Sequence, residues 1–314
     1  MCEPQQGMSY AEVVALARTA EEAGFESFFR SDHYSSFPGE AGLPTTDAWA
    51  TLAGIALETT RITFGALVSP VTFRQPGNFA KLVTTISEMS GGRVEVGVGA
   101  GWNDEEHAQH AIPYPETRER YDMLEEELAI LHGLWTEPDG WSYEGAHWAV
   151  RDARFYPKPL APPGRRHPNI IVGGGGGPRM CALVARYADE MNISSKGPAA
   201  VAEAFERLDD ACRTEGRDPS EVTRSIMTGV LVGESETDVR DRVGELMDLF
   251  GSSSEDADAW LDERRGRWII GTPDEARERI ESFAHVGTER IMLQTFLPRD
   301  LDMVRLAARI FLSR

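Results

Sequence analysis

The feature that most constrains the fold is an alternation of short apolar runs with amphipathic segments. Each run is rich in β-branched or aromatic residues, and most are followed by hydrophobic residues at helical spacing. Alternating strands and helices with short links are typical of a parallel sheet covered by helices. The sequence therefore predicts an α/β fold with strands at 25–31, 62–68, 94–98, 169–172, 190–194, 225–232 and 290–296.

A short remnant at 1–4 completes a set of eight parallel strands, which is the number in a (β/α)8 TIM barrel. A doubly wound open sheet would show the same local pattern but would not need eight units. Because no long repeat or low-complexity linker divides the chain, we expect a single domain over 1–314. The first strand is short, and a true start upstream of Met1 would explain this.

The segments between the strands predict helices and two excursions. A β-hairpin insertion between strands 4 and 5 is expected at 141–156, and a polar surface segment at 252–267. We expect both to shape the mouth of a pocket. Residues 268–271 are expected to lead into a helix that ends near 286. The other expected helices are 9–23, 47–58, 78–89, 117–135, 178–187, 199–215, 237–250 and 301–312.

Charge and cysteine content exclude several classes of partner. The formal net charge of −19 disfavours nucleic acid and anionic membranes, which bind clustered Lys and Arg. The three cysteines, Cys2, Cys181 and Cys212, give no disulfide or metal framework. No apolar run approaches the roughly 18 residues that span a bilayer, and no signal peptide is visible. We therefore expect a cytoplasmic protein that acts on a small molecule.

Two strands end in stretches with little or no side chain. The strand at 94–98 is followed by Gly99, Ala100 and Gly101 and then by Trp102, and the strand at 169–172 runs into five glycines, 173–177. Either stretch alone could be a tight turn. Both together, at strand ends where TIM barrels hold their sites, predict a bare main-chain surface for a flat, polar ligand. Pro178 then opens a helix, whose start with Arg179 favours an anion.

Few acid–base groups lie at the predicted strand ends. His33 is suited to proton transfer near neutral pH, although a lone histidine at a strand end is more often a packed, hydrogen-bonded residue. Glu105, Glu106, His107 and His110 lack the HExxH order, so we predict no metal site. Cys2 could be a thiol in the site, but burial of a small side chain also explains it. With so few groups, a cofactor is expected to supply the difficult chemistry.

The chain resembles the bacterial luciferase-like family of flavin and deazaflavin oxidoreductases, and within it the branch that uses coenzyme F420. The stretches that carry the resemblance follow the family's order over nearly the full length: EPQQG at 3–7, FRSDH at 29–33, FRQPG at 73–77, MSGGRVEVGVGAGW at 89–102, RY with EE at 120–126, and PKP at 157–159 before IVGG at 171–174.

The resemblance implies a cofactor ring at the strand ends, backed by a non-prolyl cis peptide near Leu67 and Val68. It implies that His33 lies beside the reactive centre of the ring. Arg179, Arg74 and Arg120, in that order, are candidates for the anionic tail of the cofactor. Glu3, Gln5 and Trp102 are the candidate substrate contacts. The main chain that would hold the cofactor is that of Ala100, Gly101, Trp102, Gly173, Gly174, Gly175 and Gly176.

One departure from the family narrows the function. Sugar-phosphate dehydrogenases of the family have a catalytic glutamate where this chain has Trp102, so that reaction is not expected. The resemblance predicts hydride transfer between F420 and a small organic substrate. The alternatives are an FMN-dependent monooxygenase supplied with reduced flavin by a partner reductase, and a barrel that binds flavin or a metabolite without turnover. A homodimer is expected, as in relatives.

Overall fold

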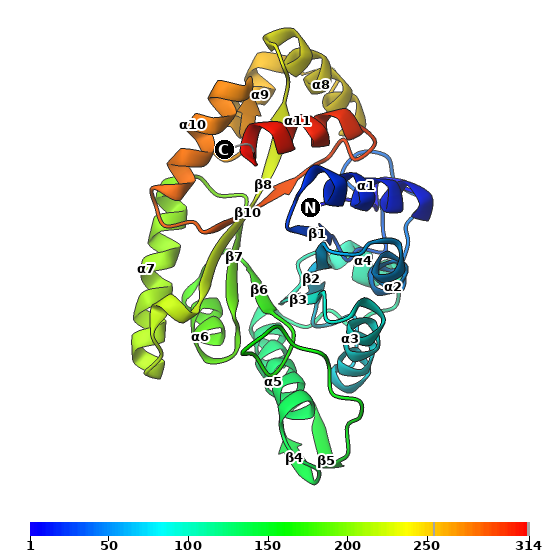
Figure 1. Cartoon of the computed structure of the whole chain (residues 1–314), viewed down its shortest axis with the longest axis vertical. Coiled ribbons are helices and arrows are strands. Elements are labelled where there is room, and N and C mark those ends of the chain that lie inside the picture. Colours follow the sequence, from blue (N-terminus) through cyan, green and yellow to red (C-terminus); the bar gives the residue numbers. More distant parts are fainter. Residues whose placement is uncertain (254, 313–314) are drawn as a thin grey trace.

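In the computed structural model, which describes residues 1–253 and 255–312, seven parallel strands form a curled sheet with helices around its outside (Figure 1). The strands follow one another in the order β1, β2, β3, β6, β7, β8 and β10. Each predicted strand is present, with small changes at its ends. The bounds are β1 Ser27–Arg30, β2 Thr63–Pro70, β3 Val94–Gly99, β6 Ile170–Gly174, β7 Glu190–Ser194, β8 Thr223–Val232 and β10 Arg290–Gln294.

The first residues of the chain lie between β1 and β10 and close the ring. Cys2 forms parallel bridges to Arg30 on one side and to Thr295 on the other. The Cys2 N–H donates to Phe29 O at 2.9 Å, and Thr295 N–H donates to Met1 O at 3.0 Å. The short remnant therefore takes the place of the first strand, and the predicted TIM-barrel architecture is confirmed.

The predicted helices are also present, and their ends follow local sequence signals. In α1 (Tyr10–Ala23), Ser9 and Glu12 form a reciprocal capping box, and Gly24 adopts a left-handed conformation with φ of 94° that ends the helix. The remaining helices of the barrel are α2 Ala48–Glu58, α3 Pro76–Ser90, α5 Thr117–Thr136, α6 Pro178–Tyr187, α7 Pro198–Glu215, α8 Glu236–Leu249, α10 Pro273–Ala284 and α11 Leu301–Phe311.

Two expectations in the C-terminal third were wrong. Residues 269–271, expected to lead directly into a helix, form the strand β9 (Ile269–Gly271) beside β8, because two buried β-branched residues extend the sheet. The segment 252–267, expected to be a polar excursion, contains the helix α9 (Ala257–Arg265) with Trp260 and Leu261 buried. Ser254 of that segment lies outside the described residues.

The predicted hairpin is present as β4 (Trp141–Glu144) and β5 (Ala149–Ala153) and lies at one end of the molecule in Figure 1. Its turn is held by Glu126 of α5, whose carboxylate accepts the N–H groups of Ala146, His147 and Trp148. Among the described residues, neither the hairpin nor the segment 252–267 lines the cavity at the strand ends. The expectation that these two segments shape the pocket mouth was therefore wrong.

The N-terminal end of the barrel is fastened by one buried ion cluster. The Arg290 guanidinium donates to both carboxylate oxygens of Glu95 at 2.8 Å and to Glu190 at 2.9 Å. These three residues come from β10, β3 and β7, so the cluster joins distant parts of the ring. Burial raises the pKa of Glu95, but the hydrogen bonds from Arg290 outweigh it and lower that pKa overall.

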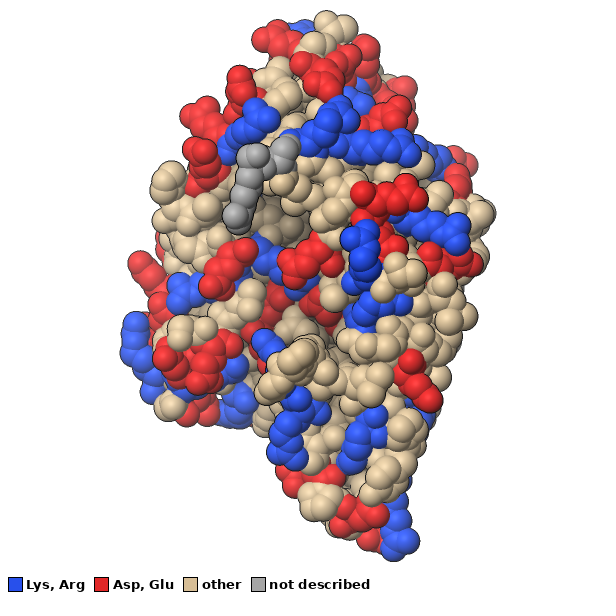
Figure 2. All heavy atoms as spheres, in the orientation of Figure 1, with Lys and Arg blue, Asp and Glu red and all other residues tan. Residues whose placement is uncertain are grey.

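On the face shown in Figure 2, Lys and Arg side chains are interspersed with the more numerous Asp and Glu side chains. Within the described part of the chain, no helix is both long enough and apolar enough to cross a bilayer.

Candidate active site

A cavity of about 730 Å³ lies at the C-terminal ends of the strands, where a TIM barrel holds its site. Residues from the first strand, from the ends of β1, β2, β3, β6, β7, β8 and β10, and from the loops after them line it. Its volume is within the range of about 300–1,000 Å³ that is usual for ligand pockets. The predicted residues that line it are Glu3, Gln5, His33, Leu67, Val68, Ala100, Gly101, Trp102, Gly173, Gly174 and Gly175.

One wall of the cavity depends on the absence of side chains at two strand ends. A Cβ on Gly99 would lie 2.7 Å from Val68 Cγ2, and one on Gly173 would lie 2.5 Å from Val68 Cγ1. The two glycines therefore let the Val68 side chain lie against the ends of β3 and β6. The Leu67-Val68 peptide bond is cis, as the sequence comparison with the family implied. The result is a wall of main chain and a small apolar side chain that a planar ring can contact.

His33 is held from behind by Glu106, which sequence reasoning did not pair with it. Glu106 Oε2 lies 2.9 Å from His33 Nδ1, while Oε1 accepts the backbone N–H groups of Tyr34 and Ser35. Glu106 is 1% exposed and lies on the short helix α4 (Asp104–Gln109), which Asn103 caps. Burial raises the pKa of Glu106. The hydrogen bonds with His33 and from the backbone lower it by more, so the pKa is lowered overall.

This contact assigns the two nitrogens of the His33 ring. A carboxylate can only accept, so Nδ1 is the protonated nitrogen. Within residues 1–253 and 255–312, Nε2 has no hydrogen-bond partner. Since His33 lines the cavity, Nε2 is the ring nitrogen available to a ligand there, as an oriented general acid or base requires.

Aromatic rings form the outer wall of the cavity next to His33. The Phe37 ring stands edge-on to His33 at 4.5 Å between centroids, and the Trp102 ring is edge-on to Phe37 at 5.3 Å. Trp102 is 65% exposed, which is unusual for so large an apolar side chain. Together the three rings offer an apolar edge to a substrate.

A second part of the cavity lining is polar. Glu3 Oε2 accepts the side-chain amide of Gln5 at 2.7 Å, and Glu3 Oε1 accepts that of Gln294 at 2.6 Å. Gln5 in turn accepts the Ser31 hydroxyl at 2.7 Å. All four residues are nine-tenths or more buried and line the cavity. The predicted substrate contacts Glu3 and Gln5 are thus brought together with two residues from the neighbouring strands.

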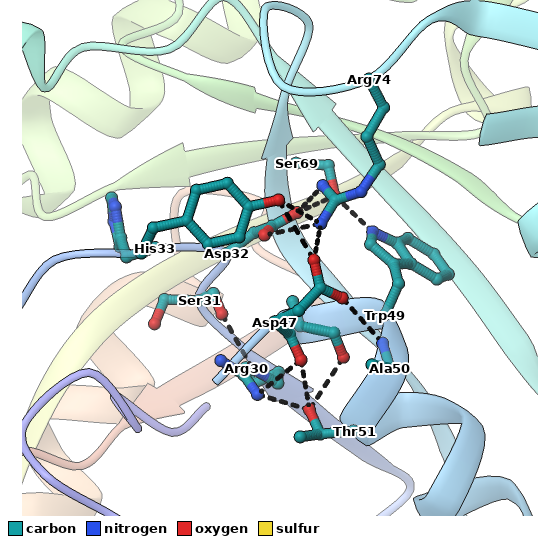
Figure 3. Close-up of polar contacts among 12 residues, drawn as sticks. Arg30, Ser31, Asp32, His33, Asp47, Trp49, Ala50, Thr51, Ser69 and Arg74 are labelled. Carbon is teal, nitrogen blue, oxygen red and sulfur yellow. Dashed lines mark hydrogen bonds and ion pairs between the residues drawn. The ribbon is translucent and has the colours of Figure 1, made fainter. Parts of the chain in front are cut away.

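Arg74, a candidate for the cofactor tail, does not line the cavity. Its guanidinium pairs with Asp32 at 2.5 Å and with Asp47 at 2.7 Å, and it also donates to the Tyr34 hydroxyl at 3.1 Å. Figure 3 shows this network, with Asp32 pointing into it and His33 lying to one side. Asp32 also accepts from Ser69, which accepts the indole N–H of Trp49. With both terminal nitrogens bound to Asp32, Asp47 and Tyr34, Arg74 supports the loop that precedes α3.

The other two arginine candidates are placed differently. Arg120 lines the cavity, but it donates to the carbonyl oxygens of Ala100 and Pro115 and lies over the Tyr114 ring. Arg179, at the start of α6, does not line the cavity. It pairs with Asp122 of α5. Gly176 does not line the cavity either. It packs against α7 instead, where a Cβ on it would lie 2.6 Å from Ala204 Cβ.

The groups considered for metal binding and for a reactive thiol have structural partners. His107 uses Nδ1 with Asn103 O at 2.5 Å and Nε2 with the Thr72 hydroxyl at 2.6 Å. Cys2 is completely buried, and burial raises its pKa to about 12. A thiol with so high a pKa is a poor nucleophile at neutral pH.

Comparisons with known proteins agree with this architecture. The family model described as luciferase-like monooxygenase matches residues 2–290. An F420-dependent glucose-6-phosphate dehydrogenase of Intrasporangium calvum is 30% identical, with 90% of this chain and 88% of that protein covered. An uncharacterized protein of Mycobacterium tuberculosis is 32% identical over 65% of this chain and 74% of its own length.

Solved structures show the same fold at lower identity. An F420-dependent secondary alcohol dehydrogenase in complex with an F420-acetone adduct has a TM-score of 0.79 and 20% identity, with 96% of each chain covered. The monooxygenase RslO1 of Streptomyces bottropensis has a TM-score of 0.81 and 24% identity, with 98% of this chain and 94% of that chain covered.

Proposed function

Because the chain belongs to the luciferase-like monooxygenase family, we propose that it is an oxidoreductase that moves a hydride between coenzyme F420 and a small organic substrate. The observation that carries the proposal is the position of His33. Its ring lines the same cavity as the wall of Val68 and the strand-end glycines, and Glu106 orients it. A planar redox ring and a proton-transfer group can thus face one substrate.

The residues present fit a planar cofactor. Leu67, Val68, Ala100, Gly101 and Trp102 would hold its ring on one side, and the main chain of Gly173, Gly174 and Gly175 would follow its side chain. Arg179, outside the cavity at the start of α6, is kept as a candidate for the anionic tail. Arg74 is left out, because its guanidinium is paired with Asp32 and Asp47 and does not line the cavity.

The relatives favour F420 over FMN as the cofactor. Several relatives of about 30% identity that cover nine-tenths of this chain are named F420-dependent dehydrogenases. One FMN-containing structure among the neighbours, a Baeyer-Villiger monooxygenase, is 20% identical and shares the fold. Bound F420 would accept or donate the hydride.

His33 would handle the proton that accompanies the hydride. In the oxidation of an alcohol, Nε2 accepts the hydroxyl proton; in the reverse direction, it returns a proton to the carbonyl oxygen. Glu106 stabilises the imidazolium that forms, since its carboxylate contacts Nδ1. Phe37 and Trp102 keep water from one side of the reacting groups.

The cofactor proposal is tested by separate titrations with FMN and F420. We expect F420 to bind at least about tenfold more tightly, a difference of about 1.4 kcal/mol. Tighter binding of FMN would favour a flavin monooxygenase that takes reduced flavin from a partner reductase. Binding without turnover of any substrate would favour a non-catalytic barrel. A homodimer, a cytoplasmic location and a separate reductase remain predictions, which gel filtration, fractionation and reconstitution can address.

A further inference from the structure

We infer that the substrate is an uncharged molecule with a hydroxyl or carbonyl at its reacting end, and that Glu3 excludes anionic substrates from the cavity. This inference rests on the proposed function, since it concerns the substrate of the same site. It goes beyond that function because it separates neutral alcohols and ketones from phosphorylated or carboxylated compounds.

The first observation is the state of Glu3. Both carboxylate oxygens accept N–H groups, from Gln5 and from Gln294, and these amides are the hydrogen-bond partners of the carboxylate within the described residues. This suits the ionised form, which can only accept. The carboxylate is 4% exposed and lines the cavity. A negative charge therefore lies at the polar side of the cavity with amides, and not a cation, in direct contact.

The second observation concerns the cations of the cavity lining. Among the described residues that line it, Arg120 is the sole arginine or lysine, and its guanidinium is held by the carbonyl oxygens of Ala100 and Pro115. Lys196 follows the lining residue Ser195, but its ammonium donates to Gly175 O at 2.8 Å. These hydrogen bonds leave the charge of Arg120 intact, but they hold it beside the end of β3, whereas Glu3 follows the strand residue Cys2 between β1 and β10. An anionic group placed against Glu3 would therefore meet no cation in direct contact.

The third observation is the chemistry of the remaining walls. Next to His33 the cavity offers the aromatic edges of Phe37 and Trp102, and its lining also contains Ser31 and the amides of Gln5 and Gln294. These groups suit an apolar body with a small polar end. The Trp102 side chain, which is 65% exposed, adds apolar surface to this part of the lining.

The reaction balances for a neutral alcohol. The carbon–hydrogen bond of the alcohol breaks and its two electrons leave as hydride to F420, while the hydroxyl proton passes to His33 Nε2. The product is a neutral ketone or aldehyde. No charge develops on the substrate beyond the transient alkoxide, which His33 rather than Glu3 must face.

The test uses two ligands of similar size that differ in charge, benzyl alcohol and benzoate, with protein saturated by F420 and with protein free of it. Calorimetry or ligand-detected NMR gives each dissociation constant. A negative charge on the ligand about 5 Å from Glu3, at an effective dielectric constant of about 20, lowers the affinity on the order of 100-fold. We therefore expect benzoate to bind at least about 30-fold more weakly than benzyl alcohol to the wild-type protein.

The Glu3→Gln variant removes the charge. We expect benzoate to bind at least about tenfold more tightly to it, while benzyl alcohol changes by less than about threefold. Glu105→Gln is the matched control, because Glu105 is an exposed acid on α4 that does not line the cavity. It changes the net charge equally and should leave both constants unchanged. If Glu3→Gln does not fold, the ratio in the wild-type protein decides the question.

Turnover gives an independent readout. With F420, we expect reduction of the cofactor by neutral secondary alcohols and none by glucose 6-phosphate. Equal binding of benzoate and benzyl alcohol, no binding of either, or turnover of glucose 6-phosphate would overturn the inference. Failure of F420 to bind would overturn the proposed function instead, and the ligand ratio in the cofactor-free protein would still test the role of Glu3.

Discussion

Glu106 Oε2 lies 2.9 Å from His33 Nδ1, although 73 positions separate the two residues in the sequence. The contact is made because α4, directly after β3, packs against the loop that leaves β1, and Glu106 also accepts two backbone N–H groups of that loop. One carboxylate thus fixes both the ring of His33 and the chain that carries it. The first two predictions separate these roles.

Replacing His33 with alanine should remove the proton-transfer group. We expect turnover to fall about 10²–10⁴-fold, the usual contribution of general acid–base catalysis, with the F420 dissociation constant changed by less than about threefold. Steady-state kinetics and a cofactor titration measure both. His285→Ala, which alters an exposed histidine after α10, is the control. Unchanged turnover of a folded His33→Ala protein would show that the histidine is structural.

Replacing Glu106 with glutamine should misdirect the ring while keeping the shape of the side chain. The amide oxygen is expected to accept the backbone N–H groups, so its NH₂ would face Nδ1 and favour the tautomer with Nδ1 unprotonated. We expect kcat to fall about 10–100-fold with KM changed by less than about threefold. The ¹⁵N shifts of the His33 ring report the tautomer directly. An unaltered tautomer together with lost activity would contradict this explanation.

The wall of the cavity can be tested at a single glycine. In Gly173→Ala the new Cβ would lie 2.5 Å from Val68 Cγ1, so the valine must move into the space expected for the cofactor. Such overpacking costs about 1–3 kcal/mol, and we expect F420 to bind about tenfold or more weakly. In Gly177→Ala, the control from the same loop, the new Cβ would meet no atom within 4 Å. Equal affinities of the two variants would argue against a cofactor at this wall.

The cluster of Arg290, Glu95 and Glu190 at the N-terminal end of the barrel should contribute to stability but not to activity. Arg290→Gln leaves Glu95 and Glu190 buried without their cation, and we expect a loss of about 3–5 kcal/mol in the free energy of unfolding. Urea denaturation measures it. Adding Glu95→Gln to that variant should restore part of the loss, because one uncompensated charge is removed. A loss that does not depend on Glu95 would point to packing of the Arg290 stem over Phe29.

Glu127 predicts a pH dependence of stability. This residue of α5 is 2% exposed, its Oε2 has no partner within the described residues, and burial raises its pKa to about 8. The folded protein therefore keeps a proton on Glu127 that the unfolded chain releases near pH 4.5. The stabilisation from this group is complete below about pH 4.5 and is lost as pH rises through about 8, by up to about 5 kcal/mol at about 1.4 kcal/mol per pKa unit.

Glu127→Gln is the variant that checks this dependence. It keeps the neutral shape of the side chain, so it should match the wild-type protein near pH 5 and exceed its stability near pH 9. Urea midpoints at the two pH values give the comparison. A variant that is less stable at both values would show that the carboxyl group is needed in its own right.

Much of the fold could be predicted from the sequence, because most helices and strands are long enough to show the periodic spacing of their hydrophobic residues. The Gly24 stop of α1, the Pro178 start of α6 and the Trp141–Glu144 strand of the hairpin all follow local signals. The three-residue strand β9 could not be foreseen, since Ile269 and Ile270 are paired only after β8 extends beside them. The buried face of α9 was hidden among charged residues.

The cavity could be predicted where main chain lines it, but not where side chains from distant loops form ion pairs or hydrogen bonds. The glycines at 99, 101 and 173–175 mark the cavity in the sequence itself. Glu106 was weighed only as a metal ligand and set aside, because nothing in its acidic run shows which loop it will face. Arg74 suggested an anion site for the same reason: Asp32 and Asp47, which occupy it, come from other loops.

The shortest strand of the barrel is also the one that carries Glu3 and Gln5. Cys2 joins β1 to β10 through a few hydrogen bonds, and the next residues along the chain reach across the same seam to Ser31 and Gln294. A molecule bound against these side chains would therefore contact residues on both sides of the short first strand. We expect a change that loosens this closure to alter ligand binding in the cavity as well as the stability of the barrel.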